Sequence, residues 1–167
     1  MNVWRLITHH EDKDGALLWS RQNGRIAIGW GAIGNIGAQG HNSADDITAA
    51  IRRHYPGSSN PHLGGSSLWD FFAGVQKGDF VILSASKPRE LVVEVKGEVE
   101  GDYQWSEQRP TLNGTPMGGD YQHQRGVLIR RDLSPEDLWL AAGGQAPGQN
   151  PHCTLVRCAR SVNEAEW

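Results

Sequence analysis

Apolar residues gather in six short runs along the chain, and their spacing predicts β-strands. The run from Phe80 to Leu83 is apolar at every position, which indicates a strand that is buried on both faces. The run that begins at Leu91 partly alternates with polar residues, as in a strand with one face on the core. The six expected strands are Val3–Thr8, Arg25–Ile28, Phe80–Leu83, Leu91–Val99, Tyr121–Arg131 and Cys153–Arg160.

Helix signals are fewer than strand signals. Ser43 and Asp46 have the spacing of a capping box, which predicts a helix over residues 44–55. A short helix is expected after Ser134, because Pro135 suits the first helical position.

A second long helix is predicted in the middle of the chain. Ser67 and Asp70 again have the spacing of a capping box, and Gly78 is a typical helix terminator. Apolar residues at helical spacing follow the expected cap, so one face of this helix should pack on the core. These residues are Leu68, Phe71, Phe72 and Val75.

Three polar or glycine-rich stretches are predicted as loops. Residues 9–20 form a polar loop that leads into a short apolar segment, and residues 56–67 form a flexible connection. Residues 109–120 form a third loop. Residues 163–167 resemble the first turn of a further helix, so we expect the chain to be the N-terminal module of a longer protein.

Together these elements predict an α+β fold. Many short strands should curl into a small barrel, with the helices packed on its outside. A length of 167 residues without an internal repeat suits a single domain over residues 1–167. No apolar run approaches the length of a membrane span, and the first residues lack the apolar stretch of a signal peptide. We therefore expect a cytoplasmic protein without a membrane partner.

A glycine motif at residues 29–34 has the form G-x-G-x-x-G, which is typical of dinucleotide-binding turns. Such a turn must open directly into a helix, and an acidic residue must follow about 20 residues later. Here the motif leads into turn-forming residues, and the later position falls in the helix predicted at 44–55. We therefore expect no nucleotide cofactor, and another reason must place Trp30 between Gly29 and Gly31.

Four segments in order resemble the EVE-like branch of the PUA-like superfamily, whose relatives include the YTH domains. They are "IAIGWGAIG", "LWDFFAGVQKGDFVIL", "VKGEVEGDYQW" and "YQHQRGVLIRRDLSPEDL". The resemblance spans residues 4–167. It implies a PUA-like barrel that recognises modified nucleic acid, as the recognition module of a modification-dependent restriction or defence system.

Such a domain would hold a methylated or otherwise modified base in an aromatic pocket, and it would perform no chemistry itself. A base inside a duplex must first be flipped out before aromatic side chains can stack on it. Trp30 is the first candidate for this pocket because its flanking glycines allow close approach of a ligand. Tyr103 and Trp105 alternate on one face, and Asp102 could accept a hydrogen bond from a base amino group. Further candidates are Trp19, Trp69, Asn35 and Ser20.

The net charge of −3 does not indicate nucleic-acid binding, because that binding rests on an excess of Lys and Arg. Local clusters of cations can nevertheless contact phosphates. His123 and Arg125 match the H-x-R strand of the family, where we expect a structural role to prevail. The partners expected are DNA, in preference to RNA, and an effector nuclease or NTPase in the same or another chain. The candidate phosphate contacts are Arg21, Arg25, Arg52, Arg53, Arg109 and Arg125.

Two alternative functions stay open at this point. Asp79, Glu94 and Lys96 follow the D…E-x-K order of metal-dependent nucleases, although no helix is expected after Lys96. A pocket for a free modified nucleoside would suit the acidic net charge. The histidine and acidic run at residues 9–12 lacks the spacing of a shared metal site, so we expect no bound metal.

Overall fold

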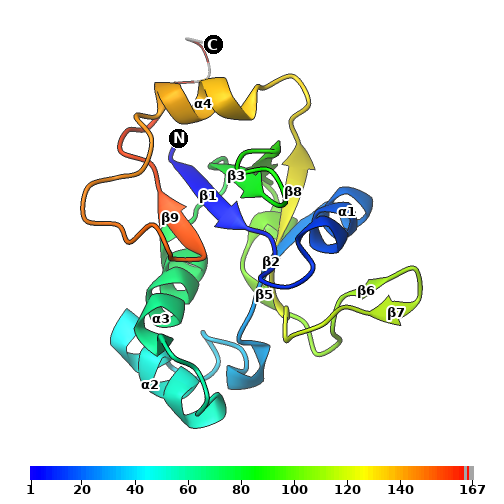
Figure 1. Cartoon of the computed structure of the whole chain (residues 1–167), viewed down its shortest axis with the longest axis vertical. Helices are drawn as coiled ribbons and strands as arrows, with labels where there is room; N and C mark the ends of the chain where they lie inside the picture. The colour runs from blue at the N-terminus through cyan, green and yellow to red at the C-terminus, as the bar shows by residue number, and fades with distance from the viewer. Residues whose placement is uncertain (164, 166–167) are drawn as a thin grey trace.

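The computed structural model describes residues 1–163 and 165, which form a curled mixed sheet with helices packed around it (Figure 1). The sheet has the strand order β2-β8-β4-β3-β1-β9, with β5 paired beside β8. It curls strongly into a half-barrel. Its strands are β1 (Val3–Ile7), β2 (Arg25–Ile28), β3 (Phe80–Ser84), β4 (Leu91–Val95), β5 (Gln104–Trp105), β8 (His123–Ile129) and β9 (Leu155–Arg157).

Strand β1 lies between β3 and β9. Its pairing with β3 is parallel and its pairing with β9 is antiparallel, so Trp4 lies opposite both Val81 and Arg157. A parallel pair needs a long crossover connection. The chain between β1 and β3 supplies it with three α-helices, strand β2 and the glycine motif. The end of β1 runs directly into His9, where the candidate site begins.

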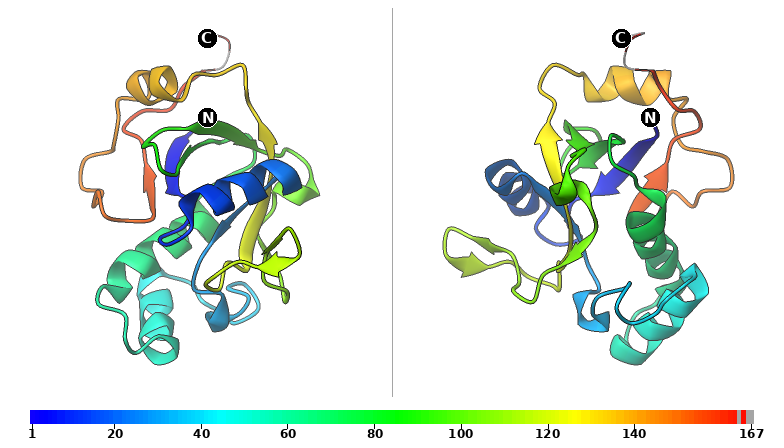
Figure 2. Two further views of the ribbon diagram at one scale, coloured as in Figure 1. Left: turned by 45° about the vertical axis from the view of Figure 1, so that its right-hand side comes forward. Right: turned by 180° about the vertical axis from the view of Figure 1, so that it is seen from behind.

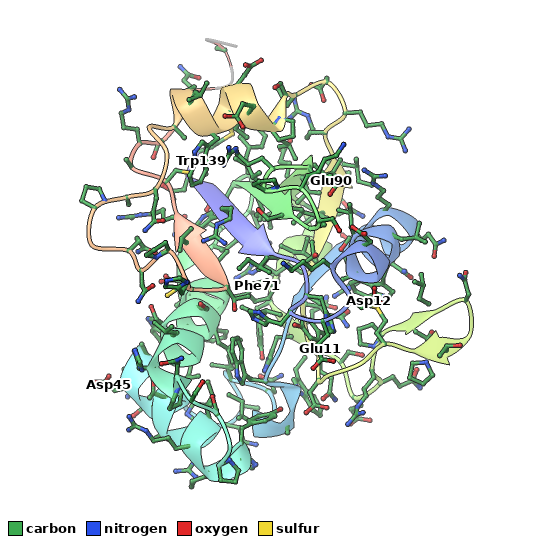
Figure 3. The ribbon with its side chains drawn as sticks, in the orientation of Figure 1. Glu11, Asp12, Asp45, Phe71, Glu90 and Trp139 are labelled. Carbon is green, nitrogen blue, oxygen red and sulfur yellow. The ribbon has the colours of Figure 1, made fainter. Side chains whose placement is uncertain are left out.

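Both faces of the central strands are buried, against different layers. On one face, Trp4, Val81 and Val93 belong to the main apolar core, which also contains Phe71 (Figure 3). On the other face, Val3 and residues of β3 and β4 pack against the last helix. Because successive side chains of a strand point to opposite faces, this arrangement explains why β3 is apolar throughout.

The helices surround the half-barrel on several sides (Figure 2). Helices α2 and α3 pack against each other and cover the main core, whereas α4 covers the opposite face. Close α2–α3 packing depends on Gly65, since a Cβ atom there would lie 1.9 Å from the Thr48 hydroxyl oxygen. The helices are α1 (Lys13–Asn23), α2 (Ala44–His54), α3 (Pro61–Trp69) and α4 (Pro135–Ala141), and a π-helical turn over Asp70–Gly74 continues α3.

The α+β class, the curled sheet and the outer helices are confirmed. Each of the six strands is present, although β4 stops at Val95 rather than Val99, and β8 and β9 are shorter at both ends than predicted. Helix α2 begins at the predicted cap, where the Ser43 hydroxyl accepts a hydrogen bond from the Asp46 backbone at 3.2 Å. The apolar stripe after residue 67 lies in the core as expected.

Three predicted loops contain regular structure instead. Residues 13–23 form α1, which Asp12 caps by accepting a hydrogen bond from the Gly15 N–H. Residues 61–66 belong to α3, so Ser67 lies inside this helix and does not cap it. Residues 111–116 form the hairpin of β6 (Thr111–Leu112) and β7 (Thr115–Pro116), which projects from the body (Figure 1). The helix turn expected at residues 163–167 includes Glu164, Glu166 and Trp167, which lie outside the described residues.

Among the residues described, no helix combines the length and apolar character that crossing a membrane requires.

Candidate functional site

A cavity of about 230 Å³ opens beyond the end of β1. Five segments that are distant in sequence meet there: the residues after β1, the glycine motif, the end of α2, the residues before β8 and the residue before β9. Glu11 lies in the first of these segments (Figure 3). The cavity is rich in aromatic rings and also holds two acidic residues. Its lining comprises His9, His10, Glu11, Gly29, Trp30, Tyr55, Gly119, Asp120, Tyr121 and Thr154.

One wall is built by the stacked rings of His9 and Tyr121. Their centroids lie 4.2 Å apart at an interplanar angle of 20°. The backbone N–H groups of Glu11 and Asp12 donate to His9 Nδ1, so the Nε2 proton is donated to the Gly118 carbonyl at 2.8 Å. These bonds fix the His9 ring, which therefore supports Tyr121 as a rigid face.

A second wall is built by Tyr55 and Asp120. The Tyr55 hydroxyl donates to one carboxylate oxygen of Asp120 at 2.8 Å, and the other oxygen pairs with Arg109 at 2.8 Å. Burial, together with the adjacent Asp120, raises the pKa of Tyr55 above its usual range. Burial also raises the pKa of Tyr121 to about 12. Both phenols therefore stay protonated at neutral pH, with the Tyr55 proton donated to Asp120.

The glycine motif holds Trp30 at the cavity in an unusual backbone conformation. Trp30 has φ 64°, in the left-handed region that residues with a side chain rarely adopt. The next position requires a glycine. The Gly31 N–H donates to the Asp120 carbonyl at 2.7 Å, and at this close approach a Cβ atom on residue 31 would lie 2.4 Å from Gln122 Oε1. The Trp30 ring packs closely on Gly64 of α3. The motif thus serves close backbone approach and the placement of Trp30.

A buried hydrogen-bond chain supports the motif from behind. The Ile36 N–H donates to the Tyr103 hydroxyl at 3.1 Å, and this hydroxyl lies 2.7 Å from His123 Nδ1. His123 Nε2 lies 3.0 Å from the Trp30 carbonyl, which can only accept. The neutral Nε2–H tautomer of His123 satisfies all three bonds. Trp105 adds a bond from its indole N–H to the Gly31 carbonyl at 3.0 Å.

The hydrogen-bond chain through His123 makes the folding stability of the protein depend on pH. Burial lowers the pKa of His123 from 6.5 to about 4, so the unfolded chain binds more protons than the folded one between these values. The contribution of neutral His123 to the free energy of unfolding is fully present above pH 6.5. About 3 kcal/mol of this free energy is lost as the pH falls to 4. We expect urea titrations to show that the free energy of unfolding rises with pH between pH 4 and 7. The slope should flatten in His123→Gln, and equal slopes in both proteins would contradict the assignment.

The structure places the predicted pocket residues in different surroundings. Trp30 lines the cavity. Tyr103 and Trp105 lie behind the glycine motif and support it through the hydrogen bonds described above. Asp102 is exposed and pairs with Lys77 at 3.0 Å, away from the cavity lining.

The remaining pocket candidates also lie outside the cavity lining. Trp19 and Ser20 are buried around a separate space of about 10 Å³, which is hardly room for one water molecule. Trp69 packs on Phe72 with ring centroids 5.7 Å apart. The Asn35 side chain accepts a hydrogen bond from its own turn.

The predicted phosphate contacts divide into exposed and engaged arginines. Arg52 and Arg53 are exposed on the last turn of α2, shortly before Tyr55. Arg21 is exposed on α1. Arg25 is half-buried and bonds to Gln104 and Gln124, and Arg109 is exposed but pairs with Asp120 at the cavity.

Arg125 requires a correction. Its side chain is 5% exposed and donates to the carbonyl groups of Phe71, Phe72 and Gly101. A guanidinium that is buried in this way cannot contact a phosphate outside the protein. The structural role expected for the H-x-R strand therefore describes Arg125 better than a contact to the nucleic-acid backbone.

The nuclease hypothesis also fails on geometry. Asp79 is buried, and its carboxylate accepts hydrogen bonds from the Asn2, Trp4 and Gln76 N–H groups. Glu94 lies opposite Phe80 in the hairpin, so it points to the other face of the sheet, where it pairs with Arg130 at 2.6 Å. The two carboxylates therefore cannot share a metal ion. Among residues 1–163 and 165, no group of three His, Cys, Asp or Glu side chains could hold one.

Sequence reasoning did not place His9, Tyr55, Asp120 or Tyr121 in the pocket. Each follows or precedes a regular element, and no local spacing connects them. The usable signal was an aromatic residue at the end of a predicted helix and another at the start of a predicted strand. Only the tertiary fold brings these ends to Trp30.

Comparison with known proteins places the chain in a family without assigning a function. No curated protein and no solved structure matches it. A family model described as a domain of unknown function, DUF8426, matches residues 4–132, which include every cavity residue except Thr154. Since this match covers most of its length, the chain belongs to the DUF8426 family.

Proposed function

We propose that this protein binds a modified base in nucleic acid, in DNA in preference to RNA, and performs no chemistry on it. The observation that carries the proposal is the cavity beside Trp30, whose walls combine aromatic rings with the carboxylates of Glu11 and Asp120. The resemblance to EVE-like domains of the PUA-like superfamily points the same way. We further propose that an effector nuclease or NTPase, in this or another chain, acts on the bound nucleic acid in the cytoplasm.

The cavity suits a planar heterocycle that has been flipped out of a duplex. Its volume of about 230 Å³ lies below the roughly 300–1,000 Å³ typical of ligand pockets, which favours a single base over a larger ligand. Stacking on an aromatic face contributes about 1–3 kcal/mol per base. Carboxylate oxygens accept hydrogen bonds from the exocyclic amino groups of adenine and cytosine.

Cations are close to two of the lining residues. Arg52 and Arg53 come shortly before Tyr55 in the sequence, and Arg109 pairs with Asp120. Contacts of these side chains to phosphates would position a strand without specifying its sequence. This local distribution offsets the net charge of −3.

The test is a binding panel of matched DNA duplexes that carry one N6-methyladenine, 5-methylcytosine or 5-hydroxymethylcytosine, or no modification. Fluorescence anisotropy over a salt series would measure the affinities, with RNA of the same sequence as comparison. We expect one modified duplex to bind at least tenfold more tightly than the unmodified one. The double variant Arg52→Ala/Arg53→Ala should weaken all duplexes alike and lower the salt slope by up to about 2. Equal weak binding to every duplex would contradict the proposal.

A free modified nucleoside is the second candidate ligand. The two carboxylates in the cavity and the net charge of −3 favour a ligand without phosphates. Nucleoside binding of this kind would be almost insensitive to salt, and the Arg52→Ala/Arg53→Ala variant would leave it unchanged. The same titrations therefore separate the two candidates.

A further inference from the structure

A second cavity of about 420 Å³ adjoins the first. Trp30, His10 and Thr154 line both cavities, and the His10 ring nitrogen Nε2 lies 2.9 Å from the Thr154 hydroxyl. These shared residues therefore form the boundary between the two spaces. The other lining residues are Ser58, Ser59, Asn60, Leu63, Gly64 and His152.

The two cavities differ in their chemistry. The first contains the carboxylates of Glu11 and Asp120, which would repel an anionic group. The second has no acidic residue in its lining, and its polar side chains carry hydroxyl, amide and imidazole groups. These groups are hydrogen-bond donors without a fixed negative charge. The lining of the second cavity therefore suits an anionic group better than that of the first.

The segment that lines the second cavity also follows the exposed cations. Residues 58–60 come shortly after Arg52 and Arg53, and the Ser58 N–H donates to the Tyr55 carbonyl at 2.9 Å. This bond ties the segment to a residue of the first cavity. Arg52 and Arg53 thus lie on the chain segment that leads into the second cavity, although they are not among its lining residues.

We propose that the second cavity binds the sugar–phosphate group attached to the base held in the first cavity. This inference rests on the proposed function and extends it, because it makes a nucleotide the unit that is recognised. Ser59, Asn60 and His152 donate to the phosphate oxygens, and the shared Trp30 separates the base from the phosphate. The base then enters the aromatic cavity while its phosphate stays in the neighbouring space.

The test compares ligands that differ only in the phosphate. Isothermal titration calorimetry would measure binding of 5-methyl-2′-deoxycytidine and N6-methyl-2′-deoxyadenosine, and of their 3′- and 5′-monophosphates. We expect the wild type to bind one nucleoside, and one of its two monophosphates at least tenfold more tightly. In Ser59→Asp the added carboxylate should weaken that monophosphate about tenfold and leave the nucleoside unchanged. Gln22→Glu adds the same charge on α1, outside both cavities. This control should bind the nucleoside and the monophosphate as the wild type does.

Three outcomes would overturn the inference. If nucleoside and monophosphates bind the wild type equally, the second cavity holds no phosphate although the base pocket stands. If Ser59→Asp weakens the nucleoside as much as the monophosphate, the second cavity belongs to the base pocket. If neither nucleosides nor monophosphates bind, and the modified duplexes do not bind either, the proposed function and the inference fall together.

Discussion

Replacing Trp30 by Gly is expected to remove recognition of the modified base while the protein stays folded. The ring at residue 30 is the aromatic face that the glycine motif holds at the cavity, so its loss removes a stacking partner. At about 1–3 kcal/mol for stacking, affinity for the preferred modified duplex should fall about 5- to 150-fold. Glycine is the chosen substitute because φ at this position is 64°. Glycine adopts this conformation without the strain of roughly 1–2 kcal/mol that a side chain introduces. The relief of this backbone strain offsets part of the stability that is lost when the Trp30 ring no longer packs against Gly64.

The Trp30→Gly experiment needs a fold measurement and a second tryptophan. Circular dichroism and thermal unfolding of the variant should resemble those of the wild type. Trp139→Leu is a matched control, since Trp139 lies on α4 against Arg89, away from both cavities (Figure 3). This control should keep the wild-type affinity. A folded Trp30→Gly protein with unchanged preference for the modified duplex would place base recognition elsewhere.

Replacing Arg125 by Met is expected to cause a large loss of stability. The guanidinium donates to three carbonyl groups, two of them in the π-helical turn after α3 and one at Gly101. Methionine fills similar space but donates no hydrogen bond. Each buried carbonyl left without a partner costs about 1–3 kcal/mol, so the free energy of unfolding should fall by about 3–5 kcal/mol. Urea unfolding followed by circular dichroism would measure this change.

Arg21→Met is the matched control for Arg125→Met. Arg21 is exposed on α1, so its replacement should change the free energy of unfolding by less than about 0.5 kcal/mol. If Arg21 contacts a phosphate, this variant should also lower the salt slope of DNA binding by about 1. Wild-type stability of Arg125→Met would contradict the structural role assigned to this residue.

Local sequence signals predicted most strands because apolar runs and strand burial coincide. They failed where glycine has a packing function. Gly64 and Gly65 suggested a flexible connection, but they lie in α3 and allow its close contact with Trp30 and α2. Helix α1 was missed because a glycine and several polar residues weaken its apolar periodicity. The hairpin β6–β7 was missed although Asn113 and Gly114 form a typical hairpin turn, since its flanking strands have only two residues each.

The candidate site was less predictable than the fold. The glycine motif pointed to Trp30. Because the motif lacks the context of a dinucleotide-binding turn, a tryptophan between two glycines needed another explanation. Tyr103 and Trp105 are predicted to share one face of a strand in the pocket, with Asp102 as an acceptor for a base amino group, but only the surrounding fold decides where these side chains lie. Tyr103 supports the motif from within, and Asp102 lies at the surface. The pocket itself depends on which chain segments meet beyond β1, and such long-range contacts leave no mark in residue spacing.

The position of β1 has a consequence for how the chain folds as it is synthesised. One edge of β1 can pair only after β3 has left the ribosome, and the other edge must wait for β9. At about 5–20 residues per second, Arg157 emerges roughly 8–30 s after its partner Trp4. Until then the apolar residues Trp4 and Leu6 of the nascent chain lack their final cover. Contacts of such long sequence separation fold slowly, so this strand is the segment that a chaperone would protect during translation.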